Sequence, residues 1–168
     1  IDNIFYAFDK ATLLPQSTAA LDQLVTLLNE NPHVTIELSA HCDDRGSAAY
    51  NQRLSQQRAE NVVHYLVAHG IQADRLTAVG YGKSKPKIVP LKLTERYPWL
   101  KAGDVLSETF IASLDKAQQE VCNQLNRRTE FRVLRTTYGL FDAQGKPKES
   151  ATKPTNKHAN TNAPERTF

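Results

Sequence analysis

The order of apolar and polar residues along the chain predicts strands that alternate with helices. Over residues 4–8, and again over residues 34–39, apolar side chains occur at every second position, which is the period of a strand with one buried face. Between these strands, residues 15–30 place apolar side chains three and four positions apart, as an amphipathic helix does. A longer helix is predicted over residues 48–68, and a third strand over residues 75–79.

The second half of the chain is less regular. Glycines at both ends of residues 80–82 predict a turn after the third strand, because glycine tolerates backbone conformations that other residues avoid. Residues 83–106 contain three prolines and predict an irregular excursion. Within it, Trp99 and its apolar neighbours form either local core, which we favour, or a contact with a partner. Helical spacing over residues 107–125 predicts one helix or two short ones, and residues 129–136 predict the last strand.

This order of elements predicts the fold class. Strand, helix, strand, helix, strand, helical excursion and strand predict an α/β sandwich, with helices covering one face of a small mixed sheet. We expect one domain over residues 1–141, with an insertion at about residues 84–125. Residues 146–167 contain no Val, Ile, Leu or aromatic residue, so burial cannot offset their ordering entropy. We therefore predict a disordered polar tail over residues 142–168.

Composition and charge narrow the function only slightly. The 168 residues include 21 basic and 18 acidic ones, and this net charge of +3 without long runs argues against a nucleic-acid partner. No apolar run approaches the roughly 18 residues of a membrane-spanning helix. The chain begins at Ile1 and contains no Met, so we expect it to be the end of a longer protein.

The first candidate for chemistry is the run of His41, Cys42, Asp43 and Asp44 after the second strand. Neighbouring residues at a strand end point to opposite faces, so His41 and Cys42 are poorly placed to act as base and nucleophile. Consecutive ligands also rarely converge on one ion, and no second cluster supplies the rest of a metal site. We therefore expect no catalytic residue and no metal, and we interpret His41 as a supporting side chain.

The long helix carries a more informative pattern. Asn51 and Arg58 are seven positions apart, so they share one helix face with Leu54. An arginine beside an apolar stripe either forms a structural contact or meets a specific anion. The loop that holds Asp43 leads into this helix, so a carboxylate and a guanidinium can converge on one pocket. Such a pocket suits a zwitterion, whose ammonium would meet Asp43 and whose carboxylate would meet Arg58, without turnover.

Several motifs in these regions resemble one known family. They are FDKATLLPQSTAALDQL, AHCDDRG, NQRLSQQRAENVVHYL, GIQADRLTAVGYGKSKP and NRRTEF, in this order. From Phe8 to Val133 the chain resembles the OmpA-like C-terminal domain, a peptidoglycan-binding module also found in peptidoglycan-associated lipoprotein and flagellar stator proteins. The resemblance covers nearly the whole body apart from the excursion and the tail.

The resemblance implies a function and a set of site residues. It implies non-covalent binding of the peptidoglycan stem peptide through meso-diaminopimelate, with no cofactor, in the periplasm and associated with the outer membrane. Asp43 stands where the family's acidic residue meets the ammonium, and Arg58 where its arginine holds the carboxylate. Further expected ligand contacts are Phe8, Asp9, Arg45, Asn51, Leu54 and Arg127. The missing upstream domains would contact other envelope proteins.

Some features depart from the family pattern. Ala40 and Cys42 replace a glycine and a small residue, which leads us to expect shifted backbone contacts in this loop. The family fold also suggests that Cys42 and Cys122 lie close enough for a disulfide. The insertion resembles those of large multidomain envelope lipoproteins, including some of the type IX secretion system. Two rival functions are a protein–protein scaffold that uses the excursion around Trp99 and an envelope hydrolase that uses Cys42.

Overall fold

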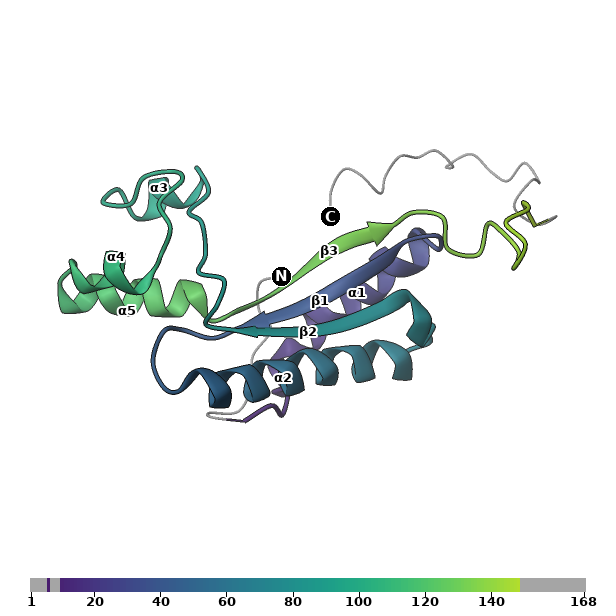
Figure 1. Cartoon of the computed structure of the whole chain (residues 1–168), viewed down its shortest axis with the longest axis horizontal. Coiled ribbons are helices and arrows are strands. Elements are labelled where there is room, and N and C mark those ends of the chain that lie inside the picture. Colours follow the sequence, from purple (N-terminus) through teal and green to yellow (C-terminus); the bar gives the residue numbers. More distant parts are fainter. Residues whose placement is uncertain (1–5, 7–9, 149–168) are drawn as a thin grey trace.

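The described part of the fold is built on a mixed sheet of three strands. The computed structural model describes residue 6 and residues 10–148 (Figure 1). The strands are β1 (Thr35–His41), β2 (Leu76–Gly82) and β3 (Arg128–Arg135), in the order β2-β1-β3. The central strand β1 pairs in parallel with β2 and antiparallel with β3. The helices are α1 (Thr18–Glu30), α2 (Ala48–Ala68), α3 (Leu93–Arg96), α4 (Glu108–Ala112) and α5 (Lys116–Asn126), with 3-10 turns at Pro15–Ser17 and Ala73–Arg75.

Helices α1 and α2 lie on the same side of this sheet (Figure 1). Their inward side chains pack against the apolar face of β1, as the three- and four-residue spacing predicted. The fully buried members of this core include Leu21, Leu28, Ile36, Leu38, Val62 and Leu66. The predicted fold class is therefore confirmed. Within the described part of the chain, no helix is long and apolar enough to span a membrane.

Strand β1 is buried on both faces, although the alternating pattern predicted only one buried face. All seven of its residues are buried, including the polar Glu37 and His41. Long side chains from the two flanking strands cover the second face: Tyr81 donates a hydrogen bond to Glu37 at 3.0 Å, and Arg132 forms an ion pair with Glu37 at 3.2 Å. The burial of polar residues is possible here because their partners come from the neighbouring strands.

The segment Gly80-Tyr81-Gly82 belongs to β2, so the prediction of a turn at this place is wrong. Glycine is needed at position 80 for packing, because a Cβ atom there would lie 2.1 Å from the backbone nitrogen of Gln56 in α2. The Gln56 side chain accepts a hydrogen bond from the nitrogen of Gly80 at 2.8 Å, and the Gln52 side chain donates one to its oxygen at 2.5 Å. These bonds fix α2 directly on β2.

Residues 84–125, which we call the insertion lobe, form a second hydrophobic cluster beyond one end of the sheet (Figure 1). Leu100, Leu106 and Cys122 are fully buried in it, and Trp99 packs against them, so the interpretation of Trp99 as local core is confirmed. Of the two alternatives for residues 107–125, the structure shows two short helices. Asp115 separates them, because it caps the start of α5 in a capping box with Gln118. The helix α3 was not predicted.

Two predicted segments lie largely outside the described residues. Of the first strand, the structure describes only Tyr6, which forms an isolated antiparallel bridge with Leu13. Of the predicted tail, it describes residues 142–148, where Asp142 donates its backbone N–H to Lys146 at 2.7 Å. The proposed domain boundaries stay a prediction.

Candidate ligand-binding cleft

A cleft of about 760 Å³ lies at the carboxyl end of β1. Its walls come from the loop after β1, from the inner face of α2, and from the end of α5 with the start of β3. Six of the predicted site residues line it: Asp43, Arg45, Asn51, Leu54, Arg58 and Arg127. Phe8 and Asp9 lie outside the described residues. The volume is in the range of small-molecule sites, roughly 300–1,000 Å³.

The loop that carries Asp43 is held to the start of α2. Gly46 has a positive φ of 86°, which allows the chain to turn, and the Ser47 side chain caps the helix by accepting from the N–H of Tyr50. Asn51 is buried, and its amide donates to the backbone oxygen of Arg45 at 2.7 Å. In this structure Asn51 therefore positions the loop, whereas the family resemblance placed it among the ligand contacts.

Arg58 lies at one end of the cleft and is held by uncharged groups. Its Nε donates to the backbone oxygen of Lys10 at 2.9 Å, and its guanidinium lies over the ring of Tyr6, 4.8 Å from the centroid. The hydroxyl of Tyr6 is hydrogen-bonded to Thr129 at 3.1 Å, which fixes the ring. Among residues 6 and 10–148, the two Nη atoms of Arg58 have no hydrogen-bond or ion-pair partner. Toward that part of the chain, the forked end of the guanidinium keeps its donors available for a carboxylate.

Asp43 lies in the same cleft and is held by two charged groups. Its Oδ2 accepts from Nη2 of Arg45 at 2.7 Å and from Nη1 of Arg127 at 2.5 Å, and its Oδ1 accepts from the backbone N–H of Arg45 at 3.0 Å. Burial alone would raise the pKa of Asp43, but the hydrogen bonds from Arg45 and Arg127 outweigh it and lower the pKa below its usual 3.8. The carboxylate is therefore ionised at neutral pH.

Glu120 on α5 completes this charged cluster and was missed by the sequence analysis. Its carboxylate accepts from Nη2 of Arg127 at 3.2 Å and lies 3.7 Å from Nη1 of Arg45. Glu120 precedes Arg127 by seven residues, a spacing that puts both on one side of a helix, and this was the available signal. Its proximity to Asp43, far away in the sequence, follows only from the fold.

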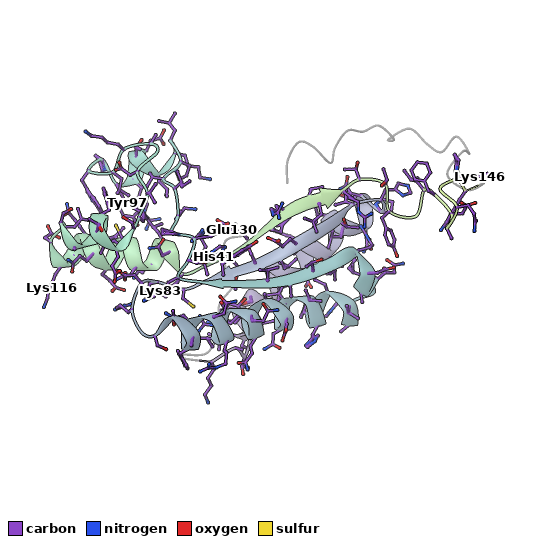
Figure 2. The ribbon with its side chains drawn as sticks, in the orientation of Figure 1. His41, Lys83, Tyr97, Lys116, Glu130 and Lys146 are labelled. Atoms are coloured by element: carbon purple, nitrogen blue, oxygen red, sulfur yellow. The ribbon has the colours of Figure 1, made fainter. Side chains whose placement is uncertain are left out.

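His41 and Cys42 have the properties of supporting residues. His41 is buried, its Nε2 lies 3.2 Å from Oγ of Ser39 and 3.6 Å from Glu130, and Figure 2 shows His41 and Glu130 together at this end of the sheet. Burial, followed by the charge of Arg128, lowers the pKa of His41 to about 4, so the imidazole is neutral at pH 7. Burial also raises the pKa of the Cys42 thiol, which disfavours a nucleophilic thiolate.

The hypothesis of a disulfide between Cys42 and Cys122 is wrong, because both are free thiols. Cys42 lines the cleft, and its sulfur lies 3.5 Å from the backbone oxygen of Asn51. Cys122 instead packs inside the insertion lobe, where burial raises its pKa to about 11. The described residues contain no group of three or more His, Cys, Asp or Glu side chains that could hold a metal ion.

A model of the OmpA family matches residues 5–92, which is more than half of the chain. The chain belongs to the OmpA family. It is 49% identical over 86 residues to outer membrane protein A of Shimwellia blattae, covering 50% of this chain and 36% of that protein. It is 39% identical over 84 residues to outer membrane porin F of Pseudomonas fluorescens, covering 50% and 26%. The match thus spans only about a third and a quarter of these relatives.

Solved structures of envelope proteins share the fold. The peptidoglycan-associated lipoprotein from Burkholderia pseudomallei has a TM-score of 0.52 at 24% identity, covering 78% of this chain and 86% of that one. The cell wall anchor of the T6SS from Pseudomonas aeruginosa has a TM-score of 0.54 at 22% identity, covering 79% and 76%. The periplasmic domain of Helicobacter pylori MotB has a TM-score of 0.54 at 15% identity, covering 81% and 71%.

These comparisons confirm the predicted family. They also confirm the predicted location in the periplasm, associated with the outer membrane, since the sequence relatives are outer membrane proteins. The family match ends at residue 92, before Glu120 and Arg127. The wall of the cleft that comes from the end of α5 and the start of β3 therefore lies outside the family match, and only the structure places it.

Proposed function

We propose that this domain binds peptidoglycan non-covalently, through the meso-diaminopimelate of the stem peptide, and so anchors a longer envelope protein to the cell wall. The observation that carries this proposal is that one cleft contains the ionised carboxylate of Asp43 and the guanidinium of Arg58, whose Nη atoms have no partner among the described residues. The likeness in fold to a peptidoglycan-associated lipoprotein and to a cell wall anchor supports it. The proposed function involves no bond making or breaking.

The two charges match the free end of diaminopimelate. Its side chain ends in a carbon that carries both an ammonium and a carboxylate, which would meet Asp43 and Arg58 respectively. A bidentate contact between Arg58 and a carboxylate is short, charge-assisted and directional. A lysine-containing peptide lacks this carboxylate, so binding it would desolvate the guanidinium without a partner, at a cost of about 1–3 kcal/mol or more.

Calorimetric titration tests the proposal. Meso-diaminopimelate and a stem peptide containing it are titrated into the wild type, Arg58→Ala and Asp43→Asn, with a lysine-containing peptide as the ligand control. Arg53→Ala is the matched protein control, because Arg53 is exposed on the same helix and does not line the cleft. We expect saturable binding by the wild type and Arg53→Ala, and none by the other two variants. A wild type that is folded by circular dichroism but does not bind would overturn the proposal.

The insertion lobe supports a second candidate function, as a protein–protein scaffold. Ile88, Leu91 and Val105 are 63%, 74% and 45% exposed, and Ile88 pairs with Val105 in an isolated bridge. Exposed apolar side chains close together are typical of contact surfaces. A scaffold function predicts that Ile88→Asp abolishes capture of an envelope partner whereas Asp43→Asn leaves it unchanged. Contacts of upstream domains with envelope proteins, and a link with the type IX secretion system, stay predictions.

A further inference from the structure

The carboxylate of Asp43 is not directly accessible to a ligand. Only 10% of its side chain is exposed, and both arginines donate to the same atom, Oδ2. The two guanidinium groups occupy both accepting positions of Oδ2, and an incoming ammonium ion needs space and an accepting position beside the same carboxylate. Release of one guanidinium from Oδ2 would provide both for the contact that the proposed function requires.

The two arginines differ in how easily they can leave. The side chain of Arg45 is 59% exposed and that of Arg127 is 35% exposed. Arg127 bridges Asp43 and Glu120 through two hydrogen bonds, at 2.5 and 3.2 Å, so its departure would break both. Arg45 makes one side-chain hydrogen bond to Asp43, and its Nη1 is already 3.7 Å from Glu120. The exposed, singly bonded guanidinium is the easier one to displace.

We propose that Arg45 competes with the ligand's ammonium for Asp43, and that Glu120 receives the Arg45 guanidinium when the ligand binds. This inference rests on the proposed function and adds two residues that determine its specificity. The exchange leaves the loop in place, because the backbone N–H of Arg45 stays on Oδ1 of Asp43 while only the side chain moves. The ammonium takes over the charge of the guanidinium, so Asp43 is neutralised both before and after the exchange.

This arrangement selects for a positive charge on the ligand. A dicarboxylate without the ammonium, such as pimelate, can pair with Arg58 but cannot replace Arg45, because it offers Asp43 no cation. A ligand with the ammonium exchanges one ion pair for another and keeps the displaced arginine satisfied on Glu120. The role differs from that implied by the family resemblance, in which Arg45 is itself a ligand contact.

The variants Arg45→Ala and Glu120→Gln test the exchange by titration with meso-diaminopimelate. Removal of the competitor in Arg45→Ala is expected to tighten binding by about 2- to 10-fold. Glu120→Gln removes the acceptor and is expected to weaken binding by a similar factor, about 2- to 10-fold. Because Glu120 acts partly through Arg45, its substitution has a smaller effect in the Arg45→Ala background. Arg53→Ala controls for the loss of one positive charge.

The outcomes separate this inference from the proposed function. Weaker or unchanged binding by Arg45→Ala, in a protein whose wild type binds and whose Arg58→Ala variant does not, overturns the exchange alone. Equal effects of Glu120→Gln with and without Arg45 also overturn it. Failure of both the folded wild type and Arg45→Ala to bind overturns the proposed function and the exchange together. Thermal unfolding of each variant confirms that it is folded, since Arg45 and Glu120 are both on the surface.

Discussion

The two ends of the cleft hold their charged groups in different ways. Arg58 is oriented by an aromatic ring and a backbone oxygen, and within residues 6 and 10–148 no carboxylate pairs with its charge. Asp43 is oriented by two guanidinium groups, which fix its position and also neutralise it. Toward the described residues the Arg58 end thus keeps hydrogen-bond donors for a ligand, whereas at the Asp43 end the proposed exchange replaces one partner by another. We infer that Arg58 discriminates against ligands that lack the carboxylate, and Asp43 against ligands that lack the ammonium.

Among the following predictions, the largest effect on ligand affinity is expected for Arg58→Lys, which keeps the positive charge. Arg58→Lys loses the planar fork and the contact with the Tyr6 ring, so we expect about 10- to 100-fold weaker binding of meso-diaminopimelate by calorimetry. The same change in Arg53, on the exposed face of α2, should leave the affinity unaltered. Affinity within a factor of two of the wild type in Arg58→Lys would contradict the view that the fork geometry matters.

The ion pairs of Asp43 with Arg45 and Arg127 predict that the stability of the fold depends on pH. The pKa of Asp43 is lower in the folded protein than in the unfolded chain, so its contribution to stability is present above pH 3.8 and is lost as the pH falls through the lowered pKa. The wild type should therefore be more stable than Asp43→Asn at pH 7, and the difference should shrink in acid. Urea unfolding of both proteins between pH 7 and the most acidic pH at which both stay folded measures this difference.

His41 does not disturb that comparison. It lies close to the cleft and its pKa is about 4, but it titrates in both proteins and cancels in the difference. A difference in unfolding free energy that stays constant down to the acid limit would show that the ion pairs of Asp43 do not stabilise the fold.

The smallest expected effect concerns the ring that orients Arg58. Tyr6→Leu removes a cation–π contact, and we expect binding of meso-diaminopimelate to weaken by about 2- to 10-fold. Tyr6→Phe keeps the ring and loses only the hydroxyl, which is bonded to Thr129 at 3.1 Å and donates to the backbone oxygen of Arg58 at 3.4 Å, so its effect should be smaller. If both variants weaken binding equally, the hydroxyl rather than the ring holds Arg58 in place.

Local patterns in the sequence predicted the helices well. The bounds of α2 agree with the prediction of residues 48–68, because Ser47 caps its start and Gly70, with a φ of 98°, follows its end. These signals lie within a few residues of the helix that they delimit. The approach of Asp43 and Arg58 to one cleft was also predictable, since only a short loop separates Asp43 from the helix that carries Arg58.

Contacts between distant segments were not predictable in the same way. The glycines of residues 80–82 were interpreted as a turn, but at Gly80 the side chain is excluded by α2. Glu120 reaches the cleft only because α5 runs back toward the sheet, and the polar face of β1 is buried by side chains of β2 and β3. Each of these features depends on a neighbour that local periodicity does not specify.

The attachment of α2 to β2 has a mechanical consequence if the domain anchors to the wall as proposed. Gln52 and Gln56 are hydrogen-bonded to the backbone of Gly80. Strand β2 is in turn hydrogen-bonded to β1, and Asp43 follows the last residue of β1 by two positions. A pull on a ligand held by Arg58 and Asp43 would thus reach the central strand from both ends of the cleft. Tension along β1 would shear its ladders with β2 and β3, so many hydrogen bonds would resist together rather than open one after another.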